Sequence, residues 1–429
     1  MAVFDVVAML LGLAALFGYV NHRLFKLPHT IGLMVITLSV SLVVLVIDAC
    51  FPGLGWKGYV AQYIHQEVDF SKALMQVMLC FLLFAGALHV KIEDLLERKV
   101  SISLLATTGV LISTALVGIM VYYLFGAFGF DPGLGPCLVF GALISPTDPV
   151  AVLGLLKVAH APRSLEAKIA GESLFNDGVG VVVFTALVAF FHMGGIDSHA
   201  VTGATDVSLL FVREVAGGVL LGFVAGSVAY LAMKSIDVYQ LEVIITLALV
   251  TGIYSLAQKV FGCSGPIAVV VAGLLIGNKG KRFAMSPVTV DHMEKFWSLI
   301  DEALNSILFL LIGLEVFVVP LESARLVEAA LLVIPVVLLA RFISVAIPIT
   351  LLKRRRNFTR GAIPILTWCG LRGGISVALV LSLEKYAVDD PMGMKLLMIS
   401  TYFVVLFSVI VQGLTVRPLL SWFLKEKPE

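Results

Sequence analysis

The chain has 429 residues, of which 59% are hydrophobic and 14% are charged, and its formal net charge is +1. An ordinary soluble domain carries roughly 25% charged residues, so this composition excludes a water-soluble globule. The near balance of 30 Lys and Arg against 29 Asp and Glu also excludes the strong overall field that would attract nucleic acid or an anionic substrate. The sequence therefore predicts an all-α polytopic membrane protein that is not an enzyme.

Thirteen apolar runs are long enough to cross the hydrocarbon core as helices, which satisfy their own backbone hydrogen bonds within lipid. In chain order they cover residues 3–20, 30–48, 73–89, 101–126, 136–157, 167–192, 207–234, 239–257, 264–277, 297–318, 326–352, 359–383 and 395–424. With the N-terminus outside, the inner loops carry about three times as many Lys and Arg residues as the outer loops, the bias of cytoplasmic loops. We therefore predict a multi-pass protein of the cell (inner) membrane with a cytoplasmic C-terminus.

Five charged residues fall deep inside the predicted spans: Asp148, Glu172, Asp177, Arg341 and Arg372. A charge at the membrane centre costs about 2.5–3.5 kcal/mol, so such residues are functional by default. The structural alternative is a set of salt bridges that locks the helices together, but two arginines neutralise only two of three carboxylates. An acid left over in a low-dielectric environment is driven to bind a proton or a cation. A site that holds one or the other is the minimum requirement for exchanging them.

Residues 171–178, with the sequence GESLFNDG, place two polar pairs one helical turn apart. Ser173 precedes Asp177 by four residues, and Glu172 precedes Asn176 by four, so each pair shares one helix face. Hydroxyl and carboxylate oxygens are hard ligands of the kind that a small alkali cation prefers. A capping or turn role for Asn-Asp-Gly is the structural alternative, which the apolar run at 179–191 disfavours because it must belong to the same span.

The fifth and twelfth predicted spans both contain helix-breaking residues, which are Pro146 and Pro149 around Thr147 and Asp148, and Gly370, Gly373 and Gly374 around Arg372. Each proline removes a backbone donor and obstructs the preceding turn, although a simple kink is the alternative. The twelfth span comes seven positions after the fifth, an odd number, so the two spans enter the membrane from opposite faces. Such a pair indicates a secondary transporter with its site at the midplane. Asp148 and Arg372 would neutralise the positive and negative helix ends that meet there.

Three motifs, SPTDP at 145–149, GESLFNDG at 171–178 and GLRGG at 370–374, closely resemble the monovalent cation:proton antiporter family and its NhaP-type sodium/proton exchangers. The resemblance covers the whole chain and implies the antiporter fold, with inverted repeats and two discontinuous helices, spans 5 and 12, that cross. It also implies a homodimer, with a transport bundle at about 101–192 and 326–424 and a dimerisation scaffold at about 1–89 and 207–318. We expect residues 1–429 to form one transmembrane domain without a cytosolic regulatory domain.

The resemblance further implies roles for the residues of the motifs. Asp177 resembles the ion-binding carboxylate, and Ser173 and the backbone carbonyl of Thr147 would complete the Na⁺ ligands. Asn176 is also expected among the ion-binding residues. It stands where electrogenic relatives have a second aspartate, which implies electroneutral exchange.

Four further charged residues resemble structural groups of the family. Glu172 is similar to the acid that pairs with an arginine of the eleventh span, here Arg341. Asp148 and Arg372 resemble the residues that stabilise the crossing of the discontinuous helices.

These implications predict electroneutral exchange of Na⁺, and also of Li⁺, for H⁺ by alternating access in the lipid bilayer, in the service of pH homeostasis. We expect no cofactor beyond the transported ions and no nucleic-acid partner. A K⁺/H⁺ antiporter on the same scaffold stays open, because selectivity depends on cavity size and ligand geometry. A cation channel is the other alternative, and it would need a continuous pore in place of a single internal carrier acid.

Overall fold

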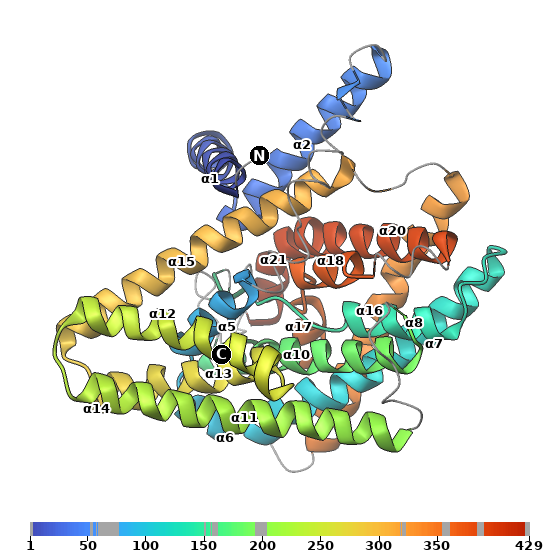
Figure 1. The fold of residues 1–429 in the computed structure, drawn as a ribbon. Helices are drawn as coiled ribbons and strands as arrows, with labels where there is room; N and C mark the ends of the chain where they lie inside the picture. The colour runs from blue at the N-terminus through green and yellow to red at the C-terminus, as the bar shows by residue number, and fades with distance from the viewer. Residues whose placement is uncertain are drawn as a thin grey trace, which may run out of the picture.

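A computed structural model of the chain describes residues 3–51, 55, 56, 58, 77–149, 152–154, 156, 162–193, 204–317, 319, 323–353, 361–383 and 390–424, and these residues form an all-helical fold (Figure 1). Parts of the predicted spans 73–89, 136–157, 297–318 and 359–383 lie outside the described residues. Eight described helices are long and apolar enough to cross a membrane: Phe4–Phe25, His29–Cys50, Ile92–Ala127, Leu165–Phe190, Phe211–Lys234, Tyr239–Phe261, Ala324–Lys353 and Pro391–Phe423. The all-α membrane class is confirmed, whereas the count of thirteen spans stays a prediction.

The described elements of the first half, in chain order, are α1 (Val3–Val20), η1 (Asn21–Phe25), α2 (His29–Cys50), α5 (Leu79–His89), α6 (Ile92–Leu104), η4 (Leu105–Gly109), α7 (Val110–Ala127), α8 (Leu134–Ile144), α10 (Arg163–Phe190) and α11 (Ala204–Lys234). The helices α6 and α7 form one continuous helix through the π-helical turn η4. The apolar helix α8 is only 11 residues long, which is short for a span, because the proline-containing segment follows directly.

The second half contains α12 (Tyr239–Leu256), η6 (Ala257–Phe261), α13 (Gly265–Leu275), η7 (Ile276–Gly280), α14 (Lys281–Phe283), α15 (Pro287–Leu314), η8 (Glu315–Phe317), α16 (Ala324–Lys353), α17 (Ala362–Trp368), α18 (Gly374–Leu381), α20 (Pro391–Phe407), η9 (Ser408–Gln412) and α21 (Gly413–Leu424). The short helices α17 and α18 are separated by the glycine-rich segment. This break corresponds to the one that follows α8.

Two helices of this half begin with a capping side chain followed at once by proline. The hydroxyl of Ser286 accepts a hydrogen bond from the backbone N–H of Thr289 at the start of α15, and Asp390 accepts one from Gly393 at the start of α20. A capping oxygen satisfies an otherwise unpaired backbone donor, and proline fits the first turn because it has no donor of its own. These residues set where the two helices begin.

Two helices begin more than two turns before the apolar runs predicted. The structure starts α6 at Ile92 and α15 at Pro287, whereas the predicted spans start at 101 and 297. The additional turns are amphipathic and charged, and in α15 the ammonium of Lys295 lies 2.6 Å from the carboxylate of Asp291, four residues earlier. The length of an apolar run detects only the part of a helix that crosses lipid. Both α6 and α15 continue beyond that part.

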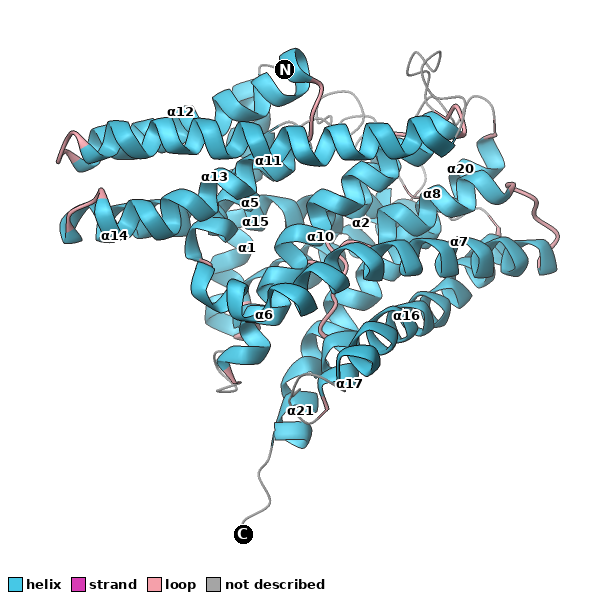
Figure 2. Cartoon of the chain, turned by 90° about the horizontal axis from the view of Figure 1, so that it is seen from below, coloured by secondary structure: helices cyan, strands magenta, loops and turns pink. Residues whose placement is uncertain are grey.

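The helix α15 is central to the packing and contacts α1, α2 and α5 (Figure 1). On one side of the molecule α11 and α12 lie side by side, and α13 packs against both (Figure 2). On another side α7 packs against α8 and α16, and α16 packs against α20. The segments that follow α8 and α17 therefore lie inside the helical assembly.

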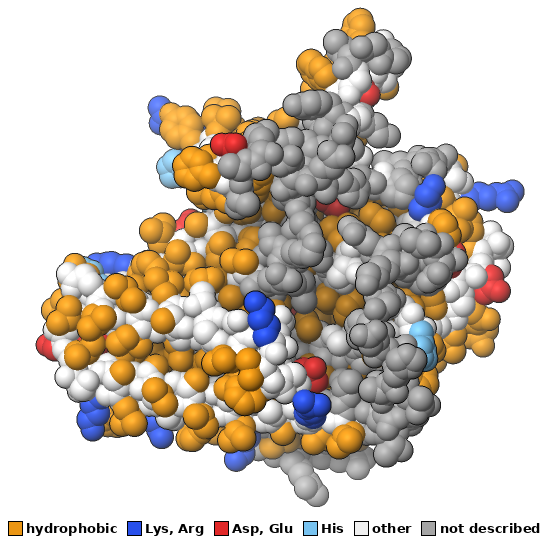
Figure 3. Space-filling model, in the orientation of Figure 1, with side chains coloured by type: hydrophobic (Ala, Val, Ile, Leu, Met, Phe, Trp, Pro, Cys, Tyr) orange, Lys and Arg blue, Asp and Glu red, His pale blue; other side chains and the backbone are white. Residues whose placement is uncertain are grey.

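The outward surface is largely apolar, as a protein surrounded by lipid requires. Figure 3 shows hydrophobic side chains across the visible face, with few charged ones among them. Along α11 the exposed side chains include Leu220, Val228 and Leu231, each more than half exposed. An apolar surface of this extent is incompatible with water and fits a bilayer.

Candidate ion-binding site

Two interrupted segments meet inside the protein. The helix α8 ends at Ile144, and after Pro146 the backbone N–H of Asp148 donates a hydrogen bond of 2.8 Å to the carbonyl of Leu371. This contact is an isolated antiparallel bridge between the two segments, which lie far apart in the sequence. Each segment thereby gives the other a backbone hydrogen-bond partner that the other's interrupted helix lacks. Non-helical backbone at membrane depth requires such a partner.

Two glycines of the second segment lie against charged side chains. A Cβ atom at Gly373 would lie 2.5 Å from the carboxylate oxygen Oδ2 of Asp148, and one at Gly370 would lie 2.7 Å from Nε of Arg341 in α16. At separations this short the neighbouring side chain must shift. Gly373 therefore allows the start of α18 to lie directly against the Asp148 side chain.

The guanidinium group of Arg372 bridges the two segments from the other direction. Its Nη1 atom donates hydrogen bonds to the backbone carbonyls of Ser145 and Pro146, the second at 2.9 Å, and the side chain is buried. These carbonyls lie at the C-terminal end of α8, where the helix dipole is negative and carbonyls lack helical partners. Arg372 thus compensates the negative C-terminal end of α8. In the same way, Asp148 lies beside the positive N-terminal end of α18.

The polar face of α10 contacts the first interrupted segment through Thr147. The hydroxyl of Ser173 donates a hydrogen bond to the backbone carbonyl of Thr147. The amide of Asn176 donates to the Thr147 hydroxyl at 2.8 Å and accepts from the Thr147 backbone N–H at 3.3 Å. These contacts fix the position of Thr147 against α10, with its carbonyl next to the Ser173 hydroxyl.

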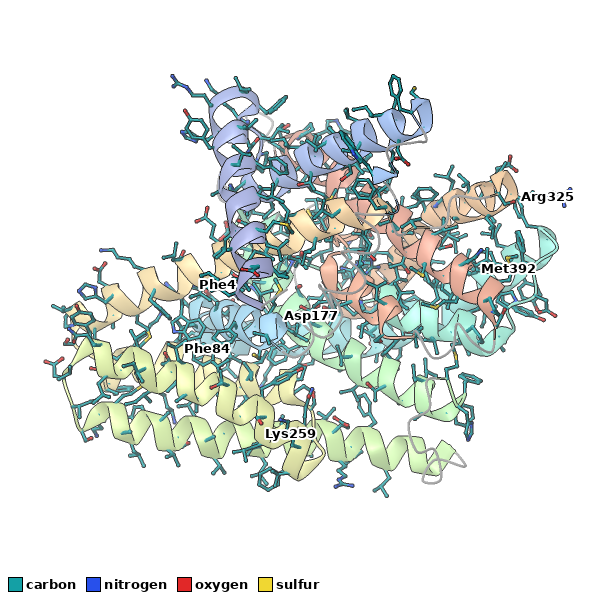
Figure 4. The ribbon with its side chains drawn as sticks, turned by 45° about the horizontal axis from the view of Figure 1, so that its top comes forward. Phe4, Phe84, Asp177, Lys259, Arg325 and Met392 are labelled. Carbon is teal, nitrogen blue, oxygen red and sulfur yellow. The ribbon has the colours of Figure 1, made fainter. Side chains whose placement is uncertain are left out.

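Asp177 lies one turn after Ser173 on the same helix and near the centre of the molecule (Figure 4). Its carboxyl group is buried, with 7% of the residue exposed, and faces a cavity of about 660 Å³. Among the described residues, none forms a hydrogen bond or ion pair with this carboxylate. A carboxylate with this environment is able to take up a proton or a cation from the cavity.

Glu172 faces away from the cavity and pairs with Arg341 of α16. The distance from Glu172 Oε1 to Arg341 Nη1 is 2.6 Å, and both side chains are buried. Arg341 also donates to the backbone carbonyl of Leu366 in α17 at 3.3 Å. The ion pair joins α10 to α16 and compensates the charge of Glu172, so that Glu172 is not available to a transported ion.

The cavity contains an acidic residue that the sequence analysis did not select. Asp301 of α15 lines it, together with Asn305 one turn later. The predicted span 297–318 places Asp301 only about one turn from its start. Because α15 begins at Pro287, Asp301 lies about four turns into the helix. The signal that could have found it is the spacing of four residues between a carboxylate and an amide.

Comparison with known proteins shows the family. The profile of the family described as "Sodium/hydrogen exchanger, transmembrane" matches residues 11–422. The chain belongs to the sodium/hydrogen exchanger family. It is therefore a multi-pass membrane protein and a transporter by family, which the composition and the apolar helices also indicate.

Individual members of this family match over nearly the whole chain. The Na⁺/H⁺ antiporter NhaP of Pseudomonas aeruginosa is 46% identical over 424 residues, which cover 97% of this chain and 96% of the relative. The Na⁺/H⁺ antiporter NhaH of Halobacillus dabanensis is 33% identical, and 93% of each chain is covered. The structure of the sodium proton antiporter MjNhaP1 of Methanocaldococcus jannaschii superposes with a TM-score of 0.77 over 99% of both chains at 17% identity. The exchanger fold is thus shared.

Proposed function

We propose that the protein exchanges Na⁺, and also Li⁺, for H⁺ across the cell membrane, one for one and without net charge movement. The observation that supports this most directly is the buried carboxylate of Asp177, which faces the cavity with no partner among the described residues. The names of the relatives, Na⁺/H⁺ antiporters in both cases, favour the same ion pair.

The contacts of the other charged residues of the three motifs support Asp177 as the carrier. Glu172 pairs with Arg341, and Arg372 is hydrogen-bonded to the carbonyls at the end of α8. Asp148 lies against Gly373 at the start of α18. Among these residues, Asp177 is the acid whose charge would be neutralised from the cavity, by Na⁺ in one half of the cycle and by a proton in the other.

The ligands proposed for Na⁺ are the carboxylate of Asp177, the hydroxyl oxygen of Ser173 and the backbone carbonyl oxygen of Thr147. Ser173 now donates to that carbonyl, so the two oxygens are already adjacent. When a cation binds, the hydroxyl proton would rotate away and both oxygens would face the ion. Asn176 would position Thr147 through its two hydrogen bonds and would contribute no charge.

Coupling follows from the cost of moving an unneutralised carboxylate. The empty, ionised carrier would have to cross a closed, low-dielectric barrier, which is expensive for a lone charge. With Na⁺ or H⁺ bound the carrier is neutral and crosses readily. Both loaded forms have the same charge, so the exchange carries no current.

The contacts also favour the proposed division into a moving bundle and a scaffold. The contacts of Thr147 with α10, of Glu172 with Arg341, and of Arg372 with the end of α8 all lie within 101–192 and 326–424. The cavity lies between this part and helices α5 and α15 of the proposed scaffold. We propose that the two crossing segments, around Asp148 and Arg372, move with the bundle during alternating access, and that the scaffold forms a homodimer.

The proposal is tested with the purified protein in proteoliposomes that hold an acid interior and a pH-sensitive dye. Added Na⁺ or Li⁺ should dissipate the pH gradient, at the same rate when the membrane potential is clamped at opposite signs. Asp177→Asn should abolish exchange while the protein stays folded, whereas Asp291→Asn, an exposed acid of α15, should exchange at the normal rate.

Three results would contradict the proposal. Retained exchange in Asp177→Asn would place the carrier elsewhere. A response to K⁺ that exceeds the response to Na⁺ would identify a K⁺/H⁺ exchanger on the same scaffold. A flux that greatly exceeds transporter rates would indicate a channel.

A further inference from the structure

Asp301 is the acidic residue of α15 that shares the cavity with Asp177. The two residues come from different helices, α15 and α10, and both line the same space of about 660 Å³. The other titratable side chains that line it are His89, Lys91, Asp94, Asp148 and Glu166. Asp301 therefore faces the route by which an ion reaches Asp177.

The position of the Asp301 carboxylate is fixed by a buried amide. Asn305, only 2% exposed, donates from Nδ2 to Oδ1 of Asp301 at 3.1 Å and to the Asp301 backbone carbonyl at 2.8 Å. A buried amide that donates to one oxygen of a carboxylate, and to the backbone carbonyl of the same residue, restricts the orientation of that carboxylate. Asp301 thus presents a carboxyl group of defined orientation on the wall of the cavity.

Asp301 shares the cavity with the proposed carrier Asp177 and with Asp148. The neighbouring acid Glu302 has an exposed side chain that does not line the cavity. The chain therefore offers two adjacent acids on one helix, of which only Asp301 faces the ion route.

We propose that Asp301, held by Asn305, is a positioning residue that raises the affinity of Asp177 for whichever cation occupies it, Na⁺ or H⁺, without binding either one as the carrier. This inference rests on the proposed function of Asp177. A negative charge across a cavity acts on charge alone, so it favours a bound Na⁺ and a bound proton by the same factor.

That equality gives the variant Asp301→Asn a distinctive pH dependence. At alkaline pH, where protons do not compete, the KM for Na⁺ should rise about five- to tenfold, the order expected when one nearby charge is removed from a partly aqueous cavity. At acid pH the proton competes with Na⁺ for Asp177. In the variant the affinity of Asp177 for the proton has fallen by the same factor as its affinity for Na⁺. The KM values of the variant and the wild type should therefore converge as the pH is lowered.

The experiment measures the Na⁺ dependence of exchange in proteoliposomes at several pH values, with the full-length protein. Asp301→Asn should show the alkaline increase in KM, the acid convergence and an unchanged maximal rate. Asp301→Glu should restore the wild-type values because the charge returns. Glu302→Gln is the matched control, since it removes the adjacent acid that lies outside the cavity, and its KM should stay normal.

Other outcomes would overturn the inference. An increase in KM by one factor at every pH would mean that Asp301 is itself a Na⁺ ligand. A lower maximal rate with unchanged KM would assign it a purely structural role, and unchanged kinetics would remove any role. In each of these cases the wild type still exchanges and Asp177→Asn does not, so the proposed function would stand. Loss of Na⁺-driven exchange in the wild type would instead refute the proposed function.

Discussion

The hydroxyl of Ser173 donates a hydrogen bond to the backbone carbonyl of Thr147, and this contact places two oxygens from distant parts of the chain next to each other. One oxygen comes from α10 and the other from the interrupted segment after α8. Asp177 follows Ser173 by one helical turn. Two of the oxygens proposed as Na⁺ ligands are therefore in direct contact, and the third comes from a residue one turn later on α10.

Ser173→Ala should raise the KM for Na⁺ about tenfold, because an oxygen that interacts with a charged group contributes about 1.5–3 kcal/mol. Protonation of Asp177 does not need this hydroxyl, so the increase should be the same at acid and alkaline pH. The measurement is the Na⁺ dependence of exchange over a pH series. Thr185→Ala is the control, since its hydroxyl is bonded to the Val181 carbonyl within the same helix. An unchanged KM in Ser173→Ala would exclude the hydroxyl as a ligand.

Glu172→Gln should lower the free energy of unfolding by about 3–5 kcal/mol, because it leaves the Arg341 charge buried without its partner. The double variant Glu172→Gln with Arg341→Met should lose less, since no buried charge is left over. Thermal unfolding in detergent measures both. Asp291→Asn breaks an exposed pair and should cost at most about 1 kcal/mol. A double variant as unstable as the sum of the single variants would show that the pair is not coupled.

Gly373→Ala should reduce exchange strongly, because the added methyl group would lie 2.5 Å from Oδ2 of Asp148 and must displace that side chain. Overpacking of this kind costs about 1–3 kcal/mol, which is enough to shift the two segments apart. The measurement is the exchange rate together with the yield of folded protein. Gly252→Ala, in α12 with nothing within 4 Å of the added atom, is the control. Normal exchange in Gly373→Ala would mean that the junction has room to adjust.

Asn176→Asp should make exchange sensitive to the membrane potential. The new carboxylate still accepts from the Thr147 backbone N–H, and the Thr147 hydroxyl is able to reverse its hydrogen bond, so the local structure should persist. A second acid beside Asp177 must also be protonated in the return step, so more than one proton would move for each Na⁺. Exchange rates under clamped potentials of opposite sign measure the effect. Equal rates at both potentials would refute the link between residue 176 and charge balance.

Much of the site follows from local features of the sequence. The four-residue spacing of Ser173 and Asp177 places them on one face of any helix that contains both. The prolines around Thr147 and the glycines around Arg372 predict breaks because each changes the backbone where it stands. Composition alone predicts an all-helical membrane protein, since lipid leaves few other ways to satisfy the backbone. These conclusions depend only on neighbouring residues.

The tertiary structure decided what lies opposite these groups. The approach of Asp148 to Leu371 and the cavity shared by Asp177 and Asp301 join segments that are distant in the chain. Asp301 lies deeper in α15 than the predicted span start at 297 implies, because apolar length does not detect the first turns, which are charged yet still helical. Periodicity shows which face of a helix is polar. Only the packing of the helices shows which other polar groups that face meets, because this depends on contacts that no local pattern contains.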